Sequence, residues 1–147
     1  FKINLNNAYV LDLFSGIGSF GIECLSRGVQ KVIFVENYLG VLPVLKQNLL
    51  GLKLKDNYEI INKDIYGDNF MSNFKYKFDI IFLDPPYKDK NFSKILSMIK
   101  HFKILKTSGI IILHRHKNEK DIFPNSFKIL EEKKYGISKI IFLSISN

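Results

Sequence analysis

The sequence has few of the features that mark secreted or membrane proteins. It contains a single cysteine, Cys24, so no intramolecular disulfide can form, and this suits a reducing compartment. No apolar run approaches the roughly 18 residues that a membrane-spanning helix needs, and residues 1–4 lack the apolar core of a signal peptide. We therefore expect a cytoplasmic protein with no membrane contact.

Arginine is also scarce, because Arg27 and Arg115 are the only two in the chain and lysine supplies nearly all of the positive charge. The net charge of +8 favours a polyanionic partner such as nucleic acid. An AT-rich genome, which enriches Lys, Asn and Ile together, is an alternative explanation. With 46% apolar and 24% charged residues, the chain is predicted to form a single domain over residues 1–147.

Apolar runs rich in β-branched and aromatic residues alternate with segments of helical periodicity. Strands are predicted over 9–14, 31–36, 58–62, Phe78–Leu83, 109–113, 127–134 and 139–145. Helices are predicted over 19–27, 40–50 and 92–104, with Pro43 in a first turn because proline disrupts a helix interior. The order predicts an α/β fold: a mostly parallel, seven-stranded open sheet with helices on both faces and a C-terminal antiparallel hairpin.

A glycine-rich loop follows the first predicted strand, with Gly16, Gly18 and Gly21 in a G-x-G-x-x-G pattern that opens a helix. Such glycines let a ligand approach the backbone N–H groups of a helix N-terminus. Glu36 ends the second strand about 20 residues further on, where a carboxylate can bind a ribose diol. This combination fits either a dinucleotide oxidoreductase or a methyltransferase.

Asp12 favours the methyl donor S-adenosylmethionine. It lies four residues before Gly16, where it can face an ammonium group, whereas a pyrophosphate would be repelled by a carboxylate. Asp64, after the third strand, lies where an adenine amino group would be read. An ordinary solvated loop carboxylate is an equal alternative for Asp64.

The tetrad Asp84-Pro85-Pro86-Tyr87 follows the fourth predicted strand. An amino nitrogen attached to a base is a poor nucleophile because its lone pair is delocalised into the ring. The Asp84 carboxylate and the Pro85 carbonyl can hold its hydrogens, so that the lone pair turns toward the methyl group, and two prolines stiffen the turn. Tyr87 offers a ring for stacking on an extruded base. The four residues are therefore the predicted catalytic group.

Residues 12–29, 33–37 and 78–87 together resemble the RsmD family, whose members are bacterial methyltransferases of a guanine N2 in small-subunit (16S) ribosomal RNA. The tetrad alone is shared with adenine-N6 DNA methyltransferases and, in a variant form, with protein glutamine methyltransferases. The Leu-Ser-Arg-Gly stretch at residues 25–28 discriminates better. The resemblance implies a Rossmann-like methyltransferase fold with S-adenosylmethionine as cofactor.

The resemblance also implies roles for single residues. Asp12, Gly16 and Gly18 would line the methionine end of the donor, Glu36 its ribose and Asp64 its adenine. The predicted donor site also includes Phe14, Ser15 and Asn37. Ribosomal RNA or a partly assembled small subunit would be the partner, bound by a monomer without a metal.

The chain departs from the family in two places. The family carries an N-terminal segment that contributes to substrate contact, and we expect this segment to be missing here. The fifth strand ends in His114-Arg115-His116, where the family leads us to expect an acidic residue. Two histidines at alternate strand positions are too few for a metal site, and contact of Arg115 or His116 with RNA phosphate stays open.

Three other functions remain as alternatives. One is methylation of adenine N6 in DNA or of a glutamine in a protein, although such enzymes need a recognition domain that 147 residues do not accommodate. Another is a catalytically inactive RNA-binding module, against which the intact tetrad argues. A nicotinamide oxidoreductase would leave Asp12 and the tetrad without a role.

Overall fold

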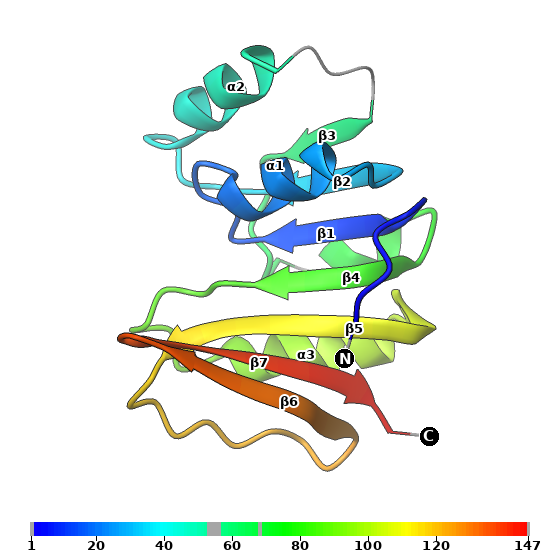
Figure 1. The fold of residues 1–147 in the computed structure, drawn as a ribbon, viewed down its shortest axis with the longest axis vertical. Helices are drawn as coiled ribbons and strands as arrows, with labels where there is room; N and C mark the ends of the chain where they lie inside the picture. Colours follow the sequence, from blue (N-terminus) through cyan, green and yellow to red (C-terminus); the bar gives the residue numbers. More distant parts are fainter. Residues whose placement is uncertain (1, 53–56, 68, 147) are drawn as a thin grey trace.

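The computed structural model describes residues 2–52, 57–67 and 69–146, which form an open sheet of seven strands in the order β3-β2-β1-β4-β5-β7-β6 (Figure 1). The parallel strands are β1 Tyr9–Leu13, β2 Lys31–Val35, β3 Tyr58–Ile61, β4 Phe78–Leu83 and β5 Leu105–His116. The strands β6 Phe127–Tyr135 and β7 Ser138–Ile145 form the antiparallel hairpin. The predicted fold class is confirmed, while positions 1, 53–56, 68 and 147 of the predicted domain lie outside the described residues.

Helices cover both faces of this sheet. On one face, α1 Ser19–Ser26 and α2 Leu42–Leu50 pack on a core that includes Val10 and Ile80. On the other, α3 Phe92–His101 and a short 3-10 helix, Phe70–Asn73, pack on a core that includes Leu11 and Ile81. Figure 1 shows α1 and α3 on opposite sides of the sheet. Because neighbouring residues of a central strand point to opposite faces, both faces of β1 and β4 must be apolar.

Two elements differ from the sequence prediction by three residues or more at an end. The strand predicted over 109–113 extends over Leu105–His116, because β4 pairs with it at Phe78↔Leu105 and β7 pairs with it as far as His116↔Ser138. The helix predicted over 92–104 ends at His101, and Lys103 adopts a positive φ of 53° that a helix cannot contain. Pro43 lies in the first turn of α2 as predicted.

No helix in the described part of the chain has the length and apolar character needed to cross a bilayer.

Candidate active site at the carboxyl edge of the sheet

Strand register brings the predicted site residues to one edge of the sheet. Leu13 of β1 pairs with Val35 and Leu83, and Leu83 pairs with Leu113. These four residues form a row across β2, β1, β4 and β5, so the residues that follow them emerge side by side. They are Glu36, Phe14, Asp84 and His114.

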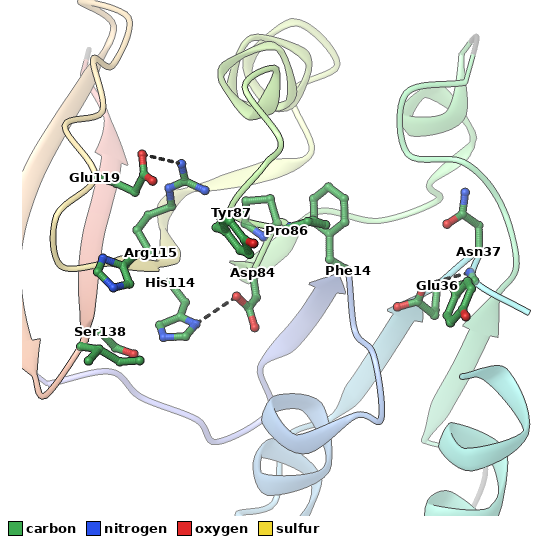
Figure 2. Close-up of a pocket in the computed structure, with 14 residues that line it drawn as sticks. Phe14, Glu36, Asn37, Asp84, Pro86, Tyr87, His114, Arg115, Glu119 and Ser138 are labelled. Atoms are coloured by element: carbon green, nitrogen blue, oxygen red, sulfur yellow. Dashed lines mark hydrogen bonds and ion pairs between the residues drawn. The ribbon is translucent and has the colours of Figure 1, made fainter. Parts of the chain in front are cut away.

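Two cavities adjoin this row. The larger, of about 920 Å³, extends from Glu36 and Asn37 to the start of β7 at Ser138. The smaller, of about 350 Å³, lies over the glycine loop and Asp12. Phe14 and Asp84 line both cavities, and Figure 2 shows them between the Glu36 side and the His114 side of the larger one. A ligand in the smaller cavity would therefore meet a ligand in the larger one beside Asp84.

Steric constraints explain why glycine occupies each of the three G positions of the G-x-G-x-x-G loop. Gly16 and Gly18 adopt φ values of 56° and 90°, where a side chain is strained. A Cβ at Gly21 would lie 2.3 Å from the ring of Phe34, so only glycine lets α1 pack this closely on β2. Gly16 lines the smaller cavity, and Gly18 lies between Ile17 and Ser19, which line it too. The loop thus combines a tight turn with an open backbone.

Asp12 lies beneath this loop and is only 1% exposed. Its Oδ2 accepts a hydrogen bond of 3.1 Å from the Gly21 N–H, while its buried Oδ1 has no partner. Desolvation by burial, only partly opposed by that hydrogen bond, raises the pKa of Asp12 to about 8, and the charges of Asp84 and Glu36 add to the rise. An unpartnered acidic oxygen at a cavity wall fits a cationic ligand group.

Glu36 connects the loop to the end of β2. Its Oε1 accepts a hydrogen bond of 2.8 Å from the Gly16 N–H, and its Oε2 accepts one of 3.0 Å from the Tyr38 N–H. A carboxylate offers about four lone-pair positions, so two remain for hydroxyl groups in the larger cavity. The exposed Asn37 lines the same cavity.

Phe14 and Ser15 form the junction between β1 and the loop. Phe14 has a φ of 56°, a strained value for a residue other than glycine, and such outliers cluster at functional sites. The Ser15 hydroxyl donates to the Val35 carbonyl at 3.3 Å and lines the smaller cavity. Both residues line the smaller cavity, and their contact with a donor stays a prediction.

Asp64 lines neither cavity and, unlike Gly18, has no chain neighbour that lines one. Its exposed side chain accepts a hydrogen bond of 3.0 Å from the Tyr66 N–H and closes a local turn. Tyr66 in turn donates to Asp89 at 2.5 Å, and this bond links the loop after β3 to the loop after β4. The role of Asp64 in binding adenine stays a prediction.

All four residues of the tetrad line the larger cavity. Pro85 is buried and holds the turn in place, whereas the side chains of Asp84 and Tyr87 are 47% and 65% exposed. The Pro86 carbonyl accepts a hydrogen bond of 2.8 Å from the Asp89 N–H, which closes the turn. The loop therefore presents a carboxylate and an aromatic ring from a rigid backbone.

The end of β5 contributes a contact that sequence reasoning missed. His114 Nδ1 lies 2.9 Å from Asp84 Oδ1 (Figure 2). The signal that could have found it is the pairing of β4 with β5, because Leu83 and Leu113 precede these two residues. In the described part of the chain, no group of three His, Cys, Asp or Glu side chains could hold a metal ion.

Arg115 is not available for phosphate in the way that the sequence left open. It is 4% exposed, and its Nε donates to Asp121 Oδ2 at 3.0 Å. Its guanidinium also lies 4.5 Å from the ring centre of Phe92. Burial and pairing therefore give Arg115 a structural role in place of the phosphate contact. His116 is exposed, and its contact with RNA phosphate stays a prediction.

Known proteins resemble this chain over most of its length. The family model described as conserved hypothetical protein 95 matches residues 1–144. The ribosomal RNA small subunit methyltransferase D of Haemophilus influenzae is 33% identical over 90% of this chain and 69% of its own length. The protein of the same name from Buchnera aphidicola subsp. Acyrthosiphon pisum is 28% identical over 88% of this chain and 66% of its own. The structure of a conserved hypothetical protein from Streptococcus pyogenes superposes with a TM-score of 0.84 at 25% identity, over 97% of this chain and 88% of its own.

Proposed function

The chain belongs to the family described as conserved hypothetical protein 95, the RsmD family, and from this premise we propose that it transfers a methyl group from S-adenosylmethionine to the exocyclic N2 of a guanine in small-subunit ribosomal RNA. The chain spans about two thirds of the length of the curated relatives it matches. The observation that carries the proposal is the position of Asp84, which lines both the cavity over the glycine loop and the cavity beside Tyr87.

The residues of the smaller cavity, together with Glu36 at one end of the larger cavity, fit the proposed donor. When bound, S-adenosylmethionine supplies a methyl group on a positively charged sulfur. The unpartnered Oδ1 of Asp12 would face its ammonium, and the free lone pairs of Glu36 would accept hydrogen bonds from its ribose. A cation beside Asp12 would offset the desolvation that raises the pKa of this carboxyl.

The tetrad would prepare the acceptor. Asp84 and the Pro85 carbonyl would each hold one hydrogen of the guanine amino group and turn its lone pair toward the smaller cavity. Bond formation between the amino nitrogen and the methyl carbon would leave the C–S electron pair on sulfur, so positive charge would develop on the nitrogen until one amino hydrogen leaves as a proton to water. A carboxylate that is already in place stabilises this charge more in the transition state than in the ground state.

Charge and exposure support an RNA partner. Lys88, Lys90 and Lys94 follow the tetrad, and Lys88 Nζ lies 5.9 Å from the ring centre of the exposed Tyr87. Because double-stranded RNA hides its base edges, the target base would lie in a loop or an exposed region of a partly assembled subunit. We propose that the protein acts as a monomer in the cytoplasm and that its RNA affinity falls steeply with salt.

The test is methyl transfer from labelled donor to small-subunit particles from cells that lack the enzyme. Asp84→Asn keeps the shape but loses the charge, and it should lower kcat on the order of 10²–10³, with donor affinity nearly unchanged. Glu132→Gln, which alters an exposed carboxylate on β6, is the matched control and should keep full activity. Full activity in Asp84→Asn would refute the role of Asp84.

Product analysis and calorimetry separate the alternatives. Methylated adenine or glutamine in place of N2-methylguanine would move the protein to another class of amine methyltransferase. Binding of NAD without binding of S-adenosylmethionine would indicate an oxidoreductase. A wild-type protein that binds RNA and donor but transfers no methyl group, even with an N-terminal segment from a relative added, would indicate an inactive module.

A further inference from the structure

The contact between His114 and Asp84 is built by the sheet itself. Leu83 and Leu113 are register partners of adjacent parallel strands, so the residues that follow them leave the sheet at the same edge. β5 is also paired on its other side, where His114 lies opposite Ile140 of β7. His114 is thus held at a fixed position in a central strand, whereas Asp84 begins a loop. His114, which the strand holds in place, can therefore orient the side chain of Asp84.

The chemistry of the pair fixes the direction of the hydrogen bond. An ionised carboxylate only accepts, so His114 must donate its Nδ1–H to Asp84 Oδ1, in the neutral ring or in the charged one. The negative charge of Asp84 acts on the nearby Asp12 and contributes to the raised pKa of that carboxyl. A hydrogen-bond donor on Asp84 offsets part of the charge of Asp84.

The neighbours of His114 on β5 are engaged elsewhere. Arg115 is held by Asp121, and His116 Nδ1 accepts a hydrogen bond of 3.1 Å from the Asn118 N–H. The side chains of His114 and Asp84 are 34% and 47% exposed, and partly exposed pairs of this kind contribute little to folding. The arrangement therefore fits a role in the site better than a role in stability.

We propose that His114 is a positioning residue for Asp84: it holds Oδ1, so that Oδ2 points at the amino group of the base. This inference rests on the proposed function, in which Asp84 accepts a hydrogen of the reacting amine. A carboxylate fixed by a second partner is preorganised, so less reorganisation accompanies the reaction. At the end of the fifth strand, where the family resemblance predicts an acidic residue, this chain thus has a histidine that donates a hydrogen bond to the catalytic carboxylate of Asp84.

Activity assays test the inference with a graded pair of variants. His114→Leu removes the donor and should lower kcat about 10-fold, with KM for RNA and donor affinity changed less than about 2-fold. His114→Asn keeps an N–H near the position of Nδ1 and should restore most of kcat. In the Asp84→Asn background, His114→Leu should have no further effect, because the carboxylate that it orients is already gone. His114→Leu with wild-type kcat, or a loss that adds fully to that of Asp84→Asn, would overturn the inference.

A second measurement does not depend on activity. Nitrogen-15 NMR of the histidine rings reports which nitrogen of the neutral ring carries the proton, and the chain has only three histidines to assign. His114 should carry its proton on Nδ1 in the wild type and shift toward Nε2 in Asp84→Ala, with His101 as the internal control. An Nε2 proton in the wild type would refute the positioning role. If the wild type transfers no methyl group while the Nδ1 proton is present, the proposed function fails and the contact stands.

Discussion

The two sides of the site place a carboxylate in opposite environments, one buried and one exposed. On the glycine-loop side, Asp12 is buried and its Oδ1 has no partner. Its cavity is also lined by Phe20 and Phe82, whose stacked ring centres lie 3.9 Å apart. On the tetrad side, Asp84 is about half exposed and is held by His114. The cavity over Asp12 is also the smaller, at about 350 Å³ against about 920 Å³.

The difference follows from what each carboxylate is proposed to meet. A buried acid with an unpartnered oxygen is costly until a cation reaches it, so the enclosed side selects one small ligand. An exposed acid costs little but has no preferred orientation, so the open side needs a second residue to aim it. The enclosed side depends on packing, and the open side depends on hydrogen bonds.

The largest expected effect is on the free energy of unfolding, which should respond differently to substitutions on the two sides of the site. Gly21→Val adds atoms where a Cβ already lies 2.3 Å from the Phe34 ring, and it should lower the free energy of unfolding by about 3 kcal/mol or more. Tyr87→Ala on the open side should change it by less than about 0.5 kcal/mol. Urea unfolding of both variants measures the contrast. Similar losses for the two variants would mean that the sides are equally packed.

Asp12→Asn should change how stability depends on pH. Since burial raises the pKa of Asp12 from 3.8 to about 8, the folded protein holds a proton that the unfolded chain releases above roughly pH 4. The wild type therefore loses stability as pH rises, at up to about 1.4 kcal/mol per pH unit until pH approaches 8. The asparagine variant lacks this loss and should gain about 2 kcal/mol relative to the wild type between roughly pH 5.5 and 7.

Unfolding curves at several pH values measure this difference. Asp64→Asn, which makes the same change at an exposed loop position, serves as the control variant. Parallel pH profiles for the wild type and Asp12→Asn would show that Asp12 is not held protonated.

Tyr87→Ala tests the open side through RNA affinity. Loss of a stacking ring should weaken binding to a single-stranded RNA loop by about 1.5 kcal/mol, whereas Tyr87→Phe keeps the ring and should bind nearly as well. Fluorescence anisotropy at one fixed salt concentration gives both values. Equal affinity for all three proteins would place base capture elsewhere.

The smallest effect concerns the bond between the two loops. Tyr66→Phe removes the hydrogen bond of 2.5 Å to Asp89 and should cost about 0.5–1 kcal/mol of stability. Tyr135→Phe, at an exposed position at the end of β6, should cost nothing measurable. Thermal unfolding distinguishes the two, and a neutral Tyr66→Phe would mean that water replaces the bond without loss.

Much of the site can be predicted from local sequence, whereas the partners of its side chains depend on neighbouring strands. The glycine loop, Glu36 and the tetrad lie in segments whose structure follows from adjacent residues, and they meet at one edge as expected for parallel strands. Asp64 follows β3 as predicted, but its side chain closes a local turn with Tyr66 and lines neither cavity. From the sequence, His114 is considered only as a metal ligand and is rejected for lack of further ligands, and nothing in its own segment indicates Asp84.

The sequence by itself determined the alternation of strands and helices, because apolar period and turn residues are local properties of the chain. It also determined which acids end which strands. Only the tertiary structure decided what each acid meets: Asp12 an apolar enclosure, Glu36 two backbone N–H groups, and Asp84 a histidine 30 positions away. The physical reason is that burial and pairing depend on strand register, and register is a relation between segments that no single segment contains.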